Sequence, residues 1–292
     1  MTTTSVIPMT VDGVRLDTLA WNIETLNGRL SVPGIRGEDP VVPGDDGAIF
    51  VPNKNFESGK MTLQMWVRGS TVDGLVPVMG TQMSEFRNNL DTITKMFTIR
   101  HRLLDIRQTW PLGDIQWMAK VEQPWDFSAS AINPRAKFAV ELDIPRTFGQ
   151  DVNTTDYTSA AALSSGVTLT MATYSGMTAP INDAIIVVRG PATNPRLTNP
   201  DTGEWVQYNG TIATGTDWRV DCGIWETRTG VGIGISSGAG TNQVANTQYA
   251  GGGARFLRLT PRPSGGPQVV LTGTSLGAGT QVLARARRKF IV

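Results

Sequence analysis

One stretch of this sequence matches a nucleophile motif. Gly234-Ile235-Ser236-Ser237-Gly238 has the Gly-x-Ser-x-Gly pattern, in which the serine sits on a strand-to-helix turn and an acid and then a histidine follow along the chain. No histidine and no helical pattern follow Ser236. We interpret the match as a chance occurrence in a loop rich in glycine and serine.

The chain has a single histidine, His101, and a single cysteine, Cys222. One cysteine excludes an intrachain disulfide and a thiolate metal cluster, and one histidine excludes a multi-histidine metal site. Any Ser-His-Asp site would have to use His101, which lies between two arginines at the end of a helical pattern, where the helix dipole favours a surface histidine. The sequence therefore predicts no catalytic, cofactor-binding or metal-ligating residue.

Two acidic pairs, Glu38-Asp39 and Asp45-Asp46, lie in a turn-rich segment. Carboxylates can hold a hard cation such as calcium, but these lack the alternating spacing of an EF-hand loop. We interpret them as solvated loop charges, with a surface contact in an assembly as the alternative.

Aromatic residues are the remaining candidates for binding. Trp205, Tyr208, Trp218 and Trp225 lie close together in the second half of the chain. Aromatic side chains fill β-sandwich cores, and exposed rings can stack on a partner or on a sugar ring. We favour core packing and keep partner or glycan contact as the alternatives.

The composition indicates which elements must position these residues. The 292 residues include 32 Gly and 17 Pro, with 40% hydrophobic and 17% charged residues, which favours a mostly β protein of two domains. The net charge of +1 argues against a nucleic-acid binder. We see no signal peptide and no apolar run long enough to span a membrane.

The first half, residues 1–148, predicts a β-sandwich or split-barrel domain with one long amphipathic helix at about 82–100. Strands are expected at 61–68, 103–109, 115–123 and 137–144 from their alternating pattern. Apolar residues recur at helical spacing and should pack on the sheet, with Thr81 or Ser84 as the cap; they are Met83, Phe86, Leu90, Ile93 and Phe97.

The second half, residues 149–292, predicts a β-sandwich or jelly roll. Asn199-Pro200-Asp201-Thr202-Gly203 reads as a hairpin turn, and Gly230–Gly253 as a long loop. The last strand carries Arg285, Arg287 and Lys289 on one face. Strands are expected at 166–173, 183–190, 204–213, 217–225, 254–260, 267–273 and 280–292.

The order of these features resembles the distal tail proteins, and related minor tail proteins, of long-tailed (siphovirus-type) bacteriophages. The resemblance rests on the strand from Phe138 to Phe148, the stretch from Arg189 to Leu197, the turn from Asn199 to Gly203, and the strand from Thr216 to Asp221 with its Trp-x-Val-Asp sequence. It covers nearly the whole chain.

The resemblance implies a virion protein without catalysis or cofactor, assembled in the host bacterial cytoplasm and located at the tail tip. The first domain would form a hexameric ring between the tail tube protein and the tail hub, near the tape measure protein. A galectin-like second domain would hold receptor-binding or fibre proteins. Two alternatives remain: a carbohydrate-binding module that uses the four aromatic residues, and a glycosidase, for which no carboxylate pair stands out.

Overall fold

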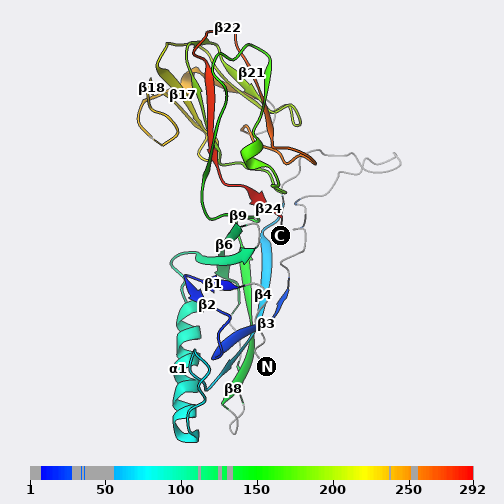
Figure 1. Cartoon of the computed structure of the whole chain (residues 1–292), viewed down its shortest axis with the longest axis vertical. Helices are drawn as coiled ribbons and strands as arrows, with labels where there is room; N and C mark the ends of the chain where they lie inside the picture. The colour runs from blue at the N-terminus through cyan, green and yellow to red at the C-terminus, as the bar shows by residue number, and fades with distance from the viewer. Residues whose placement is uncertain are drawn as a thin grey trace, which may run out of the picture. The chain divides into compact units, whose positions relative to one another are not determined.

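The computed structural model describes residues 8–27, 34, 36, 56–110, 113–123, 127–129, 134–236, 238–250 and 256–291. The chain forms two compact units, Met1–Gln150 together with Ile291, and Asp151–Phe290. Figure 1 draws both units and confirms the mostly β class with one α-helix in the described chain. The expected boundary after residue 148 falls close to this division, but Ile291 groups with the first unit, not the second.

The first unit is built on an antiparallel sheet whose main path runs β2-β1-β5-β6-β8-β4-β3. Strand β4 alternates as expected, with Met61, Leu63, Met65 and Val67 all buried. Its neighbour β8 pairs with it along ten residues, from Gly59↔Ile144 to Arg68↔Arg135. The strands are β1 (Met9–Val11), β2 (Val14–Arg15), β3 (Trp21–Asn27), β4 (Gly59–Arg68), β5 (Leu104–Trp110), β6 (Gly113–Val121), β7 (Ser128–Ala129), β8 (Arg135–Ile144) and β9 (Gly149–Asp151).

The helix of this unit, α1, spans Met79–Phe97 and packs on the sheet through Phe86, Ile93 and Phe97. Leu90 packs against the same core. Met83 does not, since it is 45% exposed. The reason is that the helix begins earlier than expected, so that its first turns extend beyond the packed region. Neither Thr81 nor Ser84 caps it, because both lie inside the helix; the N-cap position is Val78, which makes no side-chain cap bond.

A buried asparagine ties α1 to the end of β4. Asn89 is 6% exposed, and its Nδ2 donates to the carbonyls of Arg68 (2.9 Å) and Ser70 (2.8 Å). A side chain at Gly69 would collide with the carbonyl of Gln82 in the helix, so glycine allows the close approach. The chain leaving β4 is therefore fixed against the middle of the helix.

The second unit is a sandwich of a six-stranded sheet, β10-β23-β12-β17-β18-β19, and a five-stranded sheet, β11-β21-β14-β15-β20. The six are β10 (Thr155–Thr158), β23 (Gln281–Ala286), β12 (Ile185–Arg189), β17 (Thr216–Asp221), β18 (Glu226–Val231) and β19 (Thr241–Asn242). The five are β11 (Val167–Thr170), β21 (Gln268–Thr272), β14 (Arg196–Thr198), β15 (Trp205–Tyr208) and β20 (Thr247–Tyr249). Three short strands form a further sheet: β13 (Ala192–Thr193), β16 (Thr211–Ile212) and β22 (Ser275–Leu276). Two 3₁₀ turns, η1 (Ala172–Tyr174) and η2 (Val244–Asn246), and strand β24 (Lys289–Phe290) complete the element order.

The core of this unit lies between the two larger sheets. Ile186 and Val220 face it from the first sheet, and Leu197 and Leu271 from the second, all with no exposed surface. The Tyr174 hydroxyl lies within hydrogen-bond distance of two carbonyls, those of Thr155 (2.9 Å) and Ala284 (3.0 Å), which satisfies a polar group at the rim of the core.

Three expectations for this unit are corrected. The stretch 254–260 is not a strand: among its described residues only Leu259 makes an isolated β-bridge, with Ile181. The glycine-rich stretch is not one loop, because β19, η2 and β20 lie within it. Strands β19 and β20 pair at the edges of their sheets. All three elements bury little, so they lack a hydrophobic period in the sequence.

The third correction concerns the C-terminal strand, which ends at Ala286 and is followed by the separate β24. Two of its three expected basic residues are paired within the unit: Arg285 pairs with Asp156 at 2.7 Å, and Lys289 with Asp183 at 2.9 Å. The sequence of the strand does not reveal these ion pairs, because Asp156 and Asp183 lie far from it along the chain.

Replacing Phe86 with Ala should lower the free energy of unfolding by about 3–5 kcal/mol, because it removes a large side chain from a packed core. Thermal or urea unfolding of the full chain measures the change. Met83→Ala, on the same helix but half exposed, is the matched control and should change stability little. Equal losses for the two variants would contradict the packing described for α1.

Residues 151–290 should fold when expressed alone, because they contain both sheets of the sandwich and the core between them. Circular dichroism should show a cooperative melt. Removing 281–286 from this fragment should abolish the melt, since β23 pairs with both β10 and β12 in the same sheet. A fragment that melts unchanged without these residues would contradict the topology.

Candidate functional site

Two of the four aromatic candidates lie in the sandwich core. Trp218 has no exposed surface and Tyr208 is 9% exposed; their rings stack with centroids 5.9 Å apart. Both residues lie on strands at inward positions, where alternation buries them. The two rings are therefore inaccessible to a sugar or partner at the surface of the unit. They pack in the core, which is the role that the sequence analysis favoured.

Trp205, at the start of β15, lies on the outward face of the second sheet. The guanidinium of Arg196 lies over its ring, 4.1 Å from the centroid, in the cross-strand diagonal position that long side chains reach. This cation–π contact occupies one face of the indole. A role for Trp205 in binding stays a prediction.

Trp225 is the most exposed of the four, at 43%. It stacks on Phe256 (6.0 Å between centroids, 16° between planes) and meets Tyr249 edge-on at 6.4 Å. We call Trp225, Tyr249 and Phe256 the aromatic patch. Tyr249 is 46% exposed and Phe256 is 5% exposed, so Phe256 forms the base and the other two rings form the accessible surface.

The backbone at Trp225 is strained. Its φ of 58° lies in the left-handed region, which costs a residue with a large side chain about 1–3 kcal/mol. The residue lies in the turn between β17 and β18, where the Gly223 amide donates to Asp221 Oδ1 at 3.1 Å. A turn held this way fixes the direction of the indole.

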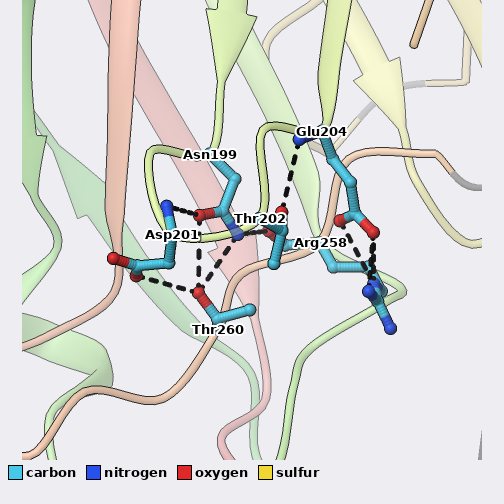
Figure 2. Close-up of polar contacts among 6 residues, drawn as sticks. All are labelled: Asn199, Asp201, Thr202, Glu204, Arg258 and Thr260. Atoms are coloured by element: carbon cyan, nitrogen blue, oxygen red, sulfur yellow. Dashed lines mark hydrogen bonds and ion pairs between the residues drawn. The ribbon is translucent and has the colours of Figure 1, made fainter. Parts of the chain in front are cut away.

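The base of the patch is positioned by a buried polar cluster in the turn between β14 and β15, drawn in Figure 2. Asn199 has no exposed surface. Its Oδ1 accepts from the Asp201 amide at 2.9 Å, which closes the turn, and its Nδ2 donates to the Arg258 carbonyl at 2.7 Å and to Thr260 Oγ1 at 3.1 Å. One side chain thus joins the turn to the segment that carries Phe256.

An ion pair makes the same connection. Glu204, 6% exposed, receives hydrogen bonds from Arg258: Nε donates to both carboxylate oxygens (3.0 and 3.1 Å), and Nη2 donates to Oε1 at 2.6 Å. Such charge-assisted bonds are strong where water is excluded. The turn that the sequence predicted therefore holds residues 256–260 in place. We call the contacts of Asn199 and Glu204 with Arg258 and Thr260 the clamp.

The aspartate that precedes Trp218 fixes the glycine-rich stretch. Asp217 has no exposed surface; it accepts from Arg189 Nε at 3.0 Å and from the Gly234 amide at 2.9 Å. Ser236 Oγ lies 3.0 Å from Nη1 of Arg285, which also pairs with Asp156. The interpretation of Gly234–Gly238 as a chance match to the nucleophile motif stays a prediction.

Among the residues that the structure describes, the other chemical candidates form no site. Burial raises the pKa of the Cys222 thiol, which disfavours the reactive thiolate. Glu38-Asp39 and Asp45-Asp46 lie outside the described residues. Among the residues that are described, no group of three His, Cys, Asp or Glu side chains could hold a metal ion, and no helix is long and apolar enough to cross a membrane.

The aromatic patch can stack on a flat apolar or sugar ring, or anchor an apolar side chain. The sequence identified Trp225 but missed Tyr249 and Phe256, which lie 24 and 31 residues further along the chain. The available signal was their position: the two aromatic residues flank a run of glycines that breaks the strand pattern.

Comparisons with known proteins give a structural relative only. No family model matches the sequence, and no curated protein matches it. The crystal structure of SPP1 Dit, a hub adsorption apparatus protein of phages that infect Gram-positive bacteria, superposes with a TM-score of 0.60 at 13% identity, covering 97% of this chain and 99% of that chain. The chain has the Dit fold. A structure of the phage p2 baseplate covers 97% of this chain and 98% of its own at 8% identity, but its TM-score of 0.37 is too low to support an argument.

Within this Dit fold, Arg258→Met should destabilise the second unit by about 3–5 kcal/mol, because Glu204 would be left buried without its partner. Urea unfolding of fragment 151–290 measures the loss. Arg228→Met, which removes the partner of the more exposed Glu226, is the matched control and should have little effect. Equal effects would contradict the clamp.

Proposed function

We propose that this chain is a structural protein of the tail tip of a long-tailed bacteriophage, a distal tail protein. In this proposal it forms a hexameric ring between the tail tube protein and the tail hub, near the tape measure protein. The first unit builds the ring, and the second unit holds receptor-binding or fibre proteins. The protein acts by assembly and not by catalysis.

One observation carries the proposal: the Dit fold extends over both units, with nearly the full length of each chain superposed. The order of features along the sequence supports it independently, because the resemblance rests on sequence motifs. The structure gives these motifs physical roles in folding: Asn199 and Asp217 each hold a distant segment through buried hydrogen bonds.

The mass of the native assembly tests the ring. Mass photometry of the purified protein should give a species of six times the 31.5 kDa chain, and a reconstruction of the virion should place six copies at the tail tip. A different symmetry in the virion would overturn the hexamer. A chain absent from purified tails would overturn the tail-tip role itself.

A second candidate function, binding of host-surface carbohydrate by the second unit, is favoured by one observation: the accessible rings of Trp225 and Tyr249 both pack against Phe256. A glycan array probed with fragment 151–290 should show retained sugars, and Trp225→Ala should abolish the signal. Val231→Ala, an exposed apolar position away from the patch, is the control. An array without signal would remove this candidate.

A further inference from the structure

Two arginines lie directly opposite each other on the outward face of the first unit's sheet. Arg68, at the end of β4, pairs in register with Arg135, at the start of β8. Both positions alternate with buried residues, so both side chains leave the sheet on the face away from the core. Like charges that face each other across an antiparallel pair are destabilising. The arrangement is therefore unfavourable for the isolated sheet.

Trp66 orients both guanidinium groups. Its ring centroid lies 5.1 Å from Cζ of Arg68 and 5.6 Å from Cζ of Arg135, within the range of a cation–π contact. The Nε of Arg68 also donates to the Leu19 carbonyl and to Ser70 Oγ. A stacked guanidinium keeps its planar fork of donors in one orientation. We call Trp66, Arg68 and Arg135 the arginine site.

The described carboxylates around the arginine site do not balance its charge. Glu24 pairs with Lys137 at 2.7 Å, and Lys137 lies opposite Trp66 in register. The hydrogen bond from Lys137, with a smaller contribution from the charge of Arg135, holds the pKa of Glu24 below its usual value. Among the described residues, therefore, one carboxylate faces three cations here, and it is bonded to the lysine.

The geometry fits carboxylates better than nucleic-acid phosphates. A guanidinium binds a carboxylate through two parallel, charge-assisted hydrogen bonds, so two neighbouring guanidiniums suit two carboxylates of one acidic peptide. Residues 1–146 hold 15 Lys and Arg against 17 Asp and Glu, a net charge of −2, and exposed Glu141 lies on the same face further along β8. This surrounding charge opposes a long polyanion, whereas a short acidic segment meets only the local cations.

We propose that the arginine site binds an acidic segment of a different protein of the tail tip, with one carboxylate held by Arg68 and another by Arg135. The inference rests on the proposed function and adds the chemistry of one contact with a neighbour. The partner supplies the missing negative charge, and complementary charges of this kind determine which surfaces meet. The adjacent acidic residues of this chain, Glu38-Asp39 and Asp45-Asp46, are the rival source that the test must separate.

The first test measures binding of the full chain to two labelled peptides, hexaglutamate and hexaglutamine, by fluorescence anisotropy at low salt. The variant is Arg135→Gln, and Arg87→Gln, at an exposed arginine of α1, is the matched control. We expect the wild type to bind hexaglutamate and not hexaglutamine. Arg135→Gln should weaken this binding by about tenfold, as for the loss of a charge-assisted pair, and the control should not.

Melting temperature separates a binding role from a structural one. Arg135→Gln removes one of two opposed like charges, so it should leave the melting temperature of the full chain unchanged or raise it. A lower melting temperature would make the arginines structural and overturn the proposal, and so would equal loss of hexaglutamate binding in the two variants. An oligothymidylate of equal charge that binds as tightly, and depends on Arg135, would assign the site to nucleic acid instead.

The source of the acidic segment is tested in a phage whose own copy of the gene is disrupted and supplied from a plasmid. Arg135→Glu should lower the titre of infectious particles by about tenfold or more, because the reversed charge repels the partner, and Arg87→Glu should not. Suppressor mutations that restore the titre should replace an acidic residue of another tail protein and thereby identify the partner.

An unchanged titre would overturn the proposal. Suppressors at Glu38-Asp39 or Asp45-Asp46 would also overturn it, because the acidic segment would then belong to this chain. Failure of the proposed function looks different, since the wild-type chain itself would then not be needed for tails.

Discussion

The buried connection between the β14–β15 turn and residues 256–260 is the constraint on which the second unit depends. Two charged groups and several backbone groups are buried in this connection. Their hydrogen-bond partners come from Asn199, Glu204 and Arg258 and not from water. Removing a single member would leave the others buried and unsatisfied, which is costly where little water can replace the lost partner. The same connection holds Phe256 under Trp225, so an accessible aromatic surface is supported by a polar interaction several residues away.

The first unit uses a simpler device for the same purpose. Asn89 reaches from the middle of α1 to the carbonyls at the end of β4, and a glycine at position 69 lets the helix approach. In both units, therefore, a buried asparagine joins segments that hydrophobic packing alone would hold in several registers. Packing supplies stability, whereas these directional bonds select one arrangement.

Much of the fold was predictable from the sequence, because its strongest signals are local. Alternation from Met61 to Val67 indicates which face of the strand is buried. Helical spacing does the same for α1, through Phe86, Ile93 and Phe97. The structure confirms that the residues on both of these faces are buried. The role of Asn89 is not predictable in this way, because a polar residue in a helix does not reveal that its side chain will reach two carbonyls at the end of β4.

The candidate site was harder to predict, because exposure depends on position and not on residue type. Trp218 and Trp225 lie seven residues apart, yet one is central in a strand and buried while the other lies in a turn and is half exposed. Tyr249 and Phe256 reach Trp225 only through the tertiary fold. The glycine run between Tyr249 and Phe256 marks these two positions in the sequence, but nothing there links them to Trp225.

The placement of β23 has a consequence for synthesis. This strand, Gln281–Ala286, lies between β10 and β12 in the interior of its sheet, although it is synthesised after the other five strands of that sheet. The main sheet path of the first unit is complete by residue 144, so that unit can fold while translation continues. The second unit cannot complete its six-stranded sheet until residue 286 has been synthesised. A chain cut short before that point would therefore display a folded first unit attached to an open half-sandwich, which proteases recognise.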